Sequence, residues 1–179
     1  ISPLGNISAI ELGVPVSINI ENGIAAIALA QITGATPDEI REGMKTFQGV
    51  DRRFDFKMKS DKVVLLSDYA HHPAEVRQSI LSVREVFDGR RITGIFQPHL
   101  YTRTRDFYRE FAESLSLLDE VILLDIYPAR ELPIEGVSSK LIYDHLRADM
   151  KKHLCDKSAL LPLLRQEETD VVMVLGAGD

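Results

Sequence analysis

Two hydrophobic patterns alternate along most of this chain. Short, β-branched apolar runs predict buried strands near residues 63–67, 91–96, 120–125 and 170–175, with a weaker strand at 152–154. Between these runs, apolar residues recur every three or four positions and predict helices near residues 73–87, 104–118, 139–149 and 158–166. This alternation predicts an α/β fold built on a mostly parallel, doubly wound sheet with flanking helices.

The first 48 residues follow a different pattern. Asn22 to Ile32 is apolar on nearly every side, which is typical of a helix buried against something large. Thr36 and Glu39, which flank Pro37, predict the capping box of a second helix that ends near Phe47. Two helices with few strands make no convincing domain alone. We therefore expect residues 1–48 to be the tail of a preceding domain and residues 49–179 to form a second one.

The predicted element boundaries rest on capping residues. Asn22 is a good N-cap for the first helix, and Ser138 and Ser158 are the expected N-caps of two later ones. Residues 51–55 form a charged segment that we interpret as a connector. Gly176-Ala177-Gly178 follows the last predicted strand, and such a turn normally leads into a helix. We therefore expect this sequence to be a fragment.

Composition narrows the function classes. The chain is 45% hydrophobic and 27% charged, as in ordinary globular proteins, and its net charge of −6 argues against non-specific binding to nucleic acid. The single cysteine, Cys155, cannot form an internal disulfide, which favours a reducing, cytoplasmic setting. No apolar run approaches the roughly 20 residues of a membrane helix.

The densest chemistry lies in Asp68-Tyr69-Ala70-His71-His72-Pro73, between a predicted strand and a predicted helix. In open α/β sheets, ligands bind at such crossings, where the helix also offers free N–H groups to an anion. We expect a site for a polar or anionic ligand. A metal site is less favoured, because adjacent histidines on an extended segment point to opposite sides. The alternative is a strand end that simply exposes polar residues.

A second motif, Phe96-Gln97-Pro98-His99-Leu100-Tyr101-Thr102-Arg103-Thr104-Arg105, ends the next predicted strand. It should lie on the same edge of the sheet as the first motif. Arg103 and Arg105 suit a carboxylate or phosphate, since a guanidinium group can bind either through two hydrogen bonds. The alternative is a solvated basic helix start paired with Asp106 or Glu110, although basic residues there oppose the helix dipole.

Two further segments contain weaker candidates for functional residues. Arg52 and Arg53 are either phosphate ligands or an ordinary surface linker. The segment Tyr127-Pro128-Ala129-Arg130-Glu131 follows the third predicted strand, and its polar groups are candidates without an assigned role. The sequence contains no Gly-x-x-x-x-Gly-Lys-[Ser/Thr] loop, no Gly-x-Ser-x-Gly elbow and no Cys/His metal spacing. By itself the chain looks like half of an active site.

The two long motifs resemble those of the Mur ligases. The first resembles the motif that opens their C-terminal domain, and the second is similar to the version found in members that add L-alanine to UDP-N-acetylmuramate. Residues 127–136 and the closing Gly176-Ala177-Gly178 extend the similarity, and Asn19 to Ala28 resembles the last helix of the family's central ATP-binding domain. The resemblance implies a Rossmann-like fold and an ATP-dependent ligase of peptidoglycan synthesis, acting through an acyl phosphate with Mg²⁺.

The resemblance also implies residue roles. Asp68 would contact the ATP ribose, and Arg53 would approach the ATP phosphates. Asn19 and Asn22 would lie near adenine. The incoming amino acid would be held by residues of both motifs, which are Tyr69, His71, His99 and Arg103. The P-loop, the Mg²⁺ ligands and the UDP-binding domain would lie outside this sequence, so we expect the chain alone to be inactive.

Two departures and two alternatives stay open. The family often has Gly-Arg-His before its first asparagine, where this chain has Val16-Ser17-Ile18, and an arginine where this chain has Leu100. One alternative function is a murein tripeptide recycling ligase. The other is a non-catalytic Rossmann-like module that binds a nucleotide or phosphate. A P-loop in a continuous reading frame upstream of Ile1 would favour a ligase.

Overall fold

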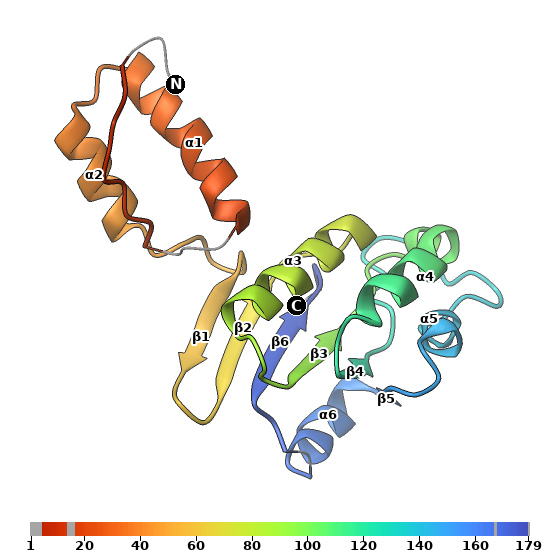
Figure 1. Ribbon diagram of the computed structural model, residues 1–179. Coiled ribbons are helices and arrows are strands. Elements are labelled where there is room, and N and C mark those ends of the chain that lie inside the picture. The colour runs from red at the N-terminus through yellow and green to blue at the C-terminus, as the bar shows by residue number, and fades with distance from the viewer. Residues whose placement is uncertain (1–4, 14–16, 167, 179) are drawn as a thin grey trace. The chain divides into compact units, whose positions relative to one another are not determined.

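The computed structural model describes residues 5–13, 17–166 and 168–178, and the chain forms two compact units, Ile1–Val50 and Asp51–Asp179 (Figure 1). We call them unit 1 and unit 2. The assignment of residues 1–48 to the tail of a central ATP-binding domain stays a prediction.

Unit 1 contains two helices, α1 (Ser17–Ile32) and α2 (Pro37–Thr46). The predicted capping box of α2 is confirmed. The Glu39 N–H donates to Thr36 Oγ1 at 3.3 Å, and the Thr36 N–H donates to Glu39 Oε2 at 2.8 Å. The predicted N-cap role of Asn22 is wrong, because α1 already begins at Ser17 and Asn22 lies inside it.

Helix α1 exposes much of its apolar surface. Ile24, Leu29 and Ile32 are 65%, 64% and 69% exposed. A helix that is apolar all round is normally buried. The burial expected from the sequence is therefore not supplied by the described residues of unit 1.

Unit 2 is a six-stranded sheet with the order β1-β2-β6-β3-β4-β5. The strands are β1 (Asp55–Lys59), β2 (Val64–Asp68), β3 (Ile92–Phe96), β4 (Glu120–Leu123), β5 (Lys151–Leu154) and β6 (Val171–Leu175). All neighbouring pairs are parallel except β1 with β2. The predicted α/β class and mostly parallel sheet are confirmed, and the last strand of the sequence lies between β2 and β3.

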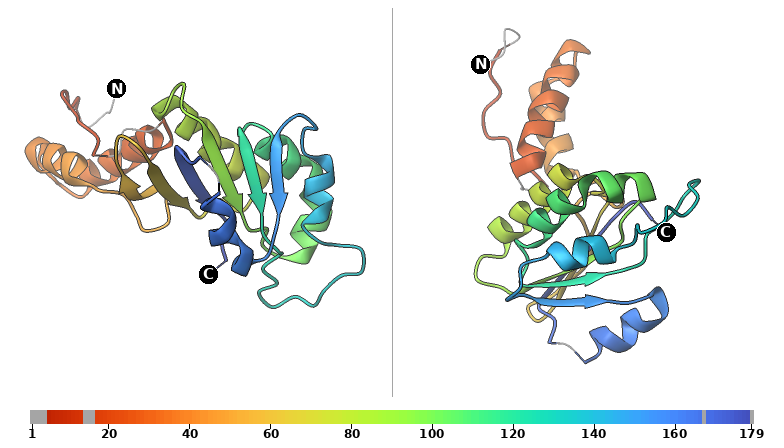
Figure 2. Two further views of the ribbon diagram at one scale, coloured as in Figure 1. Left: turned by 90° about the horizontal axis from the view of Figure 1, so that it is seen from below. Right: turned by 90° about the vertical axis from the view of Figure 1, so that its right-hand side faces the viewer.

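Helices cover both faces of this sheet (Figure 2). One face carries α3 (Pro73–Val86), α4 (Tyr101–Leu115) and α5 (Lys140–His145), and the other carries α6 (Lys157–Leu164). The stripe predicted for α3 is buried, with Val76, Ile80 and Val83 at 0% exposure. On the opposite face, leucines of α6 pack against a buried cluster that includes Ile95 and Ile122.

Strand β1 is missing from the sequence-based prediction, which treated residues 51–55 as a connector. The strand is short, antiparallel and at the edge of the sheet, with a register shift between Phe56 and Met58. Its lysines, Lys57 and Lys59, are exposed, as is common on edge strands. An exposed edge strand does not show the apolar run that reveals a buried one.

Several predicted helix boundaries are also wrong. Helix α4 begins at Tyr101 rather than at residue 104, and α5 ends at His145 rather than near residue 149. The N-cap of α5 is Ser139 rather than Ser138, and the Ser139 hydroxyl donates to the Leu124 carbonyl instead of capping. The N-cap of α6 is Asp156 rather than Ser158. Its carboxylate accepts the Ala159 N–H at 3.0 Å.

Candidate functional site

The carboxyl ends of β2, β6 and β3 form one edge of the sheet, which we call the rim. Asp68 is in register with Leu175, and Leu175 is in register with Phe96. Because these strands are parallel, the two sequence motifs that follow β2 and β3 emerge side by side. The prediction that both motifs lie on one edge is confirmed.

Asp68 ends β2 in a half-buried position. The Ser79 hydroxyl of α3 donates to Asp68 Oδ2 at 2.6 Å. Burial raises the pKa of the Asp68 carboxyl above its ordinary value, although the Ser79 hydrogen bond and the nearby Arg53 charge oppose that shift. The fold therefore holds this carboxylate at a cost, which is typical of groups kept for function.

Tyr69 and His71 follow directly, with their rings 5.2 Å apart in an edge-on arrangement. His71 Nδ1 lies 2.8 Å from the Tyr69 carbonyl oxygen. A carbonyl oxygen only accepts, so Nδ1 carries the proton and Nε2 holds the lone pair when the ring is neutral. Glu75 accepts the N–H groups of His71 and His72, which fixes the start of α3 beneath this ring.

His99 and Arg103 join this cluster from the second motif. The His99 ring lies 6.1 Å from the His71 ring, and Arg103 Nη1 donates to His99 Nδ1 at 3.4 Å. Burial, the Arg103 charge and His71 together lower the pKa of His99, so this imidazole is held neutral. The structure therefore brings together Tyr69, His71, His99 and Arg103.

Arg105 behaves differently from Arg103. Its guanidinium group pairs with Asp106 at 2.7 Å, and both side chains are about half exposed. The solvated alternative considered for this helix start therefore holds for Arg105, whereas Arg103 donates to His99.

The Tyr127–Glu131 segment, which had no assigned role, also reaches the rim. The Tyr127 ring stacks on the His99 ring at 5.7 Å with an angle of 20° between the planes. Glu131 accepts the N–H of Thr102 at 2.9 Å and also binds its hydroxyl. The only sequence signal was the position of this segment after a predicted strand.

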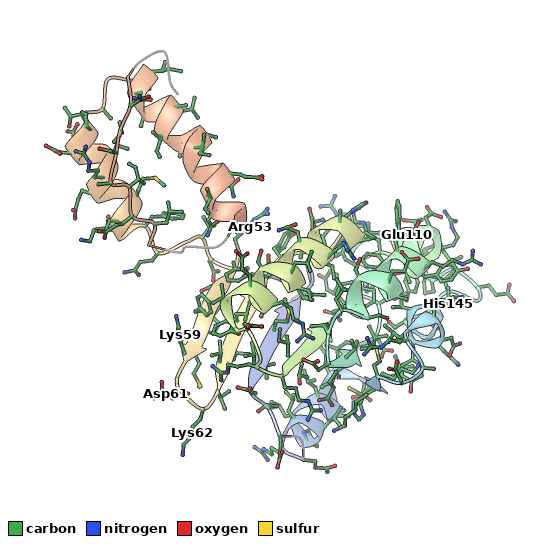
Figure 3. All side chains as sticks on the ribbon, viewed as in Figure 1. Arg53, Lys59, Asp61, Lys62, Glu110 and His145 are labelled. Atoms are coloured by element: carbon green, nitrogen blue, oxygen red, sulfur yellow. The ribbon has the colours of Figure 1, made fainter. Side chains whose placement is uncertain are left out.

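The two neighbouring arginines both lie near the Tyr69 ring but differ in their other contacts and in exposure. Arg52 donates to the carbonyl oxygens of Gly176 and Gly178, at 3.1 and 2.6 Å, and lies 5.0 Å from the centre of the Tyr69 ring. Arg53 is exposed and 5.7 Å from the same ring (Figure 3). Arg52 thus secures the glycine turn after β6, while Arg53 remains accessible to an anion.

The glycine turn itself needs glycine. Gly176 has φ +133°, and a Cβ there would lie 2.7 Å from the Gln97 carbonyl oxygen. This close approach fixes the end of β6 against the end of β3. The turn therefore has a packing reason that is independent of any dinucleotide.

Asn19 and Asn22 belong to unit 1. Both line a cavity of about 190 Å³ between α1 and α2, together with Gly23, Met44 and Phe47. A larger cavity, of about 560 Å³, lies on the α6 side of the rim. None of Asp68, Tyr69, His71, His99 and Arg103 is among its lining residues. The ring cluster is therefore defined by the contacts among its side chains and not by either cavity.

Metal-binding clusters and membrane-spanning helices can be assessed for residues 5–13, 17–166 and 168–178. Within these ranges, no group of three or more His, Cys, Asp or Glu side chains is arranged to hold a metal ion. No helix among the described residues is long and apolar enough to cross a membrane.

Comparison with known proteins agrees with this geometry. The family described as "Mur ligase, glutamate ligase domain" matches residues 52–178. The chain is 66% identical, over all of its 179 residues, to a UDP-N-acetylmuramate–L-alanine ligase of Phocaeicola vulgatus, and covers 39% of that protein. It is 55% identical to the ligase of the same name from Porphyromonas gingivalis, over 99% of this chain and 39% of that protein.

A solved structure is also similar. The UDP-N-acetylmuramate–alanine ligase of Thermotoga maritima matches with a TM-score of 0.76 and 30% identity, over 95% of this chain and 36% of that one. The chain thus spans less than two fifths of the length of these relatives. On the family match and these relatives together, the chain belongs to the Mur ligase family.

Proposed function

We propose that this chain is the C-terminal part of a cytoplasmic, ATP-dependent ligase that joins L-alanine to UDP-N-acetylmuramate. The observation that carries the proposal is the cluster of Tyr69, His71, His99 and Arg103 at the shared end of β2 and β3. In support, relatives that bear this activity in their names are up to 66% identical to the chain.

Within unit 2, Asp68 and Arg53 would contact ATP, and within unit 1, Asn19 and Asn22 would contact its adenine. The Asp68 carboxylate accepts hydrogen bonds, as a ribose hydroxyl requires, and the exposed guanidinium of Arg53 suits a phosphate. Asn19 and Asn22 line a cavity whose other walls are apolar, which suits a flat base such as adenine. Arg53 would act as a catalytic residue by stabilising charge on the transferred phosphoryl group.

Mg²⁺ requires several oxygen ligands and favours carboxylates. The described residues contain no such group, so we propose that its protein ligands lie on the part of the enzyme that this chain does not include. The metal would neutralise phosphate charge there.

The ring cluster would hold L-alanine. Arg103 presents a guanidinium that can clamp the amino acid's carboxylate, while the rings of Tyr69 and His99 enclose it. His71 would act as the catalytic base, because its Nε2 carries the lone pair and can take a proton from the ammonium group. The freed amine then attacks the activated carboxyl carbon of UDP-N-acetylmuramate, and phosphate leaves as the amide bond forms.

The test uses a chimera in which residues 1–179 replace the matching 39% of the Phocaeicola vulgatus ligase. We expect ADP formation that depends on both L-alanine and UDP-N-acetylmuramate. Arg103→Ala should raise the KM for L-alanine by about tenfold to a hundredfold, since a lost charge-assisted hydrogen bond costs about 1.5–3 kcal/mol. Arg103→Lys should rescue only part of this loss, because an ammonium lacks the planar fork.

Arg105→Ala is the matched control, because Arg105 pairs with Asp106 at the surface. It should leave the KM for L-alanine within about twofold of the unmodified chimera. The proposal fails if the chimera uses a murein tripeptide and not L-alanine, or if it binds nucleotide without turning it over. Arg103 is not the clamp if Arg103→Ala behaves like Arg105→Ala.

A further inference from the structure

The segment that follows β4 crosses the rim beside the second motif (Figure 1, the loop between β4 and α5). We call residues 127–137 the strap. The strap pairs with the motif as a short parallel bridge. The Leu100 N–H donates to the Tyr127 carbonyl at 3.0 Å, and the Tyr127 N–H donates to the Pro98 carbonyl at 2.8 Å. This pairing places the Tyr127 ring flat against His99.

Glu131 fastens the strap at a second point. Its carboxylate binds the Thr102 N–H at 2.9 Å and the Thr102 hydroxyl, in the first turn of α4. The first-turn N–H groups of a helix have no partners within the helix, and a negative charge there is favourable. Glu131 thus offsets the unfavourable placement of Arg103 and Arg105 at a helix start. The hydrogen bonds from Thr102 lower the pKa of the Glu131 carboxyl, so the group is ionised.

The backbone at Leu100 has a conformation that its own residue type does not favour. Leu100 precedes α4 with φ +75° and ψ +137°, a conformation that side-chain-bearing residues rarely adopt. Contacts from elsewhere in the chain must therefore hold the turn that sets the direction of His99 and Arg103. The strap supplies them, through the Tyr127 carbonyl at Leu100 and through Glu131 at Thr102.

We propose that Glu131 is a positioning residue for the amino-acid site. It acts through the strap and the first turn of α4, which together hold His99 against Tyr127 and direct Arg103 toward the histidines. The inference rests on the proposed function, because it assigns Glu131 to the binding of the same amino acid.

The charge of Glu131 also reaches His99. The groups that face His99 are Arg103 from α4, His71 from the β2–α3 connection, and Glu131 and Tyr127 from the strap. Arg103 and His71 lower the pKa of His99, and Glu131 raises it. Removing the Glu131 charge should therefore lower the pKa of His99 further.

The kinetic test uses the same chimera. Glu131→Gln keeps the size of the side chain and removes its charge. It should raise the KM for L-alanine by about tenfold and leave the KM for ATP within about twofold, as expected for a lost charge-assisted hydrogen bond. Thr102→Val, which removes the partner hydroxyl, should act in the same direction. Thr102→Ser keeps a hydroxyl at this position. Its KM for L-alanine should therefore stay within about twofold of the unmodified value. Glu135→Gln is the matched control, an exposed carboxylate of the same strap.

A second readout follows the imidazole of His99 by NMR during a pH titration of the 179-residue chain. Glu131→Gln should move the His99 titration to lower pH, and Glu135→Gln should not. If Glu131 only stabilised the fold, Glu131→Gln would lower the melting temperature without both raising the KM for L-alanine and moving the His99 titration.

The outcomes separate this proposal from the proposed function. An unmodified chimera that does not use L-alanine would refute the proposed function, and the role of Glu131 at that site with it. If the unmodified chimera is active, the role of Glu131 alone is refuted by either of two results. One is that Glu131→Gln leaves the KM for L-alanine unchanged. The other is that it leaves the His99 titration unchanged.

Discussion

Asp68→Asn tests whether the fold keeps this carboxylate for function rather than for stability. The half-buried carboxylate accepts the Ser79 hydroxyl at 2.6 Å, yet its pKa is raised because burial disfavours the charged form. An asparagine amide oxygen can accept the same hydroxyl without a charge to desolvate. We therefore expect the free energy of unfolding of Asp68→Asn to stay within about 1 kcal/mol of wild type at pH 7, or to exceed it.

The raised pKa of Asp68 also determines how the stability difference between Asp68→Asn and wild type changes with pH. A carboxyl whose pKa is raised on folding binds protons more tightly in the folded than in the unfolded chain. Its contribution to stability is therefore fully present below the ordinary aspartate pKa of about 3.9, and is lost as pH rises through the raised value. Asp68→Asn has no carboxyl to ionise at this position, so it does not lose this stability as pH rises. The free energy of unfolding of the variant, minus that of wild type, should become more positive between pH 4 and pH 8.

Urea unfolding followed by circular dichroism at several pH values measures this difference. Ser79→Ala is the comparison, because it leaves the charge and removes the donor. It should cost about 1–3 kcal/mol, which corresponds to about 2–9 °C in melting temperature for a chain of this size. In the chimera, Asp68→Asn should weaken ATP binding although the fold is intact. The reasoning is refuted if wild type is more stable than Asp68→Asn by a margin that grows with pH.

Two further predictions concern stability. Arg52→Met should lower the free energy of unfolding of unit 2 by about 1–3 kcal/mol, since two hydrogen bonds from a charged group to Gly176 and Gly178 are lost. Arg53→Met, at the exposed neighbour, should change it by less than about 0.5 kcal/mol. Glu120→Gln, at a fully buried carboxylate bound by Arg91 and His153, should cost about 1–3 kcal/mol by urea unfolding. The exposed Glu113→Gln should be neutral. Equal effects within either pair would contradict the contacts described.

The parts of the fold that sequence predicts are those with strong local signals. The buried strands of unit 2 are short apolar runs, and the capping box at Thr36 and Glu39 lies within four residues. Asn22, Ser138 and Ser158 are equally plausible caps by residue type, but α1 begins before Asn22, and the N-cap positions of α5 and α6 are Ser139 and Asp156. Capping propensity is worth about 1 kcal/mol, and tertiary packing over a whole helix outweighs it.

The order of the strands depends on contacts that no local pattern contains. Strand β6 is the last strand of the described residues and yet separates β2 from β3. The prediction that the two motifs share an edge needed only parallel strands, and it is correct. Glu131 and Tyr127 could not be assigned from sequence, because their partners, Thr102 and His99, are 28 or 29 residues away.

Arg52 and Arg53 show why identical neighbours can take different roles. The backbone of Arg52 has φ +58°, and although both guanidinium groups lie near the Tyr69 ring, their other contacts differ. The Arg52 guanidinium meets carbonyl oxygens 124 and 126 residues further along, whereas Arg53 stays exposed. A left-handed residue that is not glycine persists only where other contacts hold it. Here these are the Asp55 carboxylate at the Arg52 N–H and the Tyr69 N–H at the Arg52 carbonyl. Which arginine binds the glycine turn and which stays exposed is therefore decided by the folded sheet and not by the local sequence.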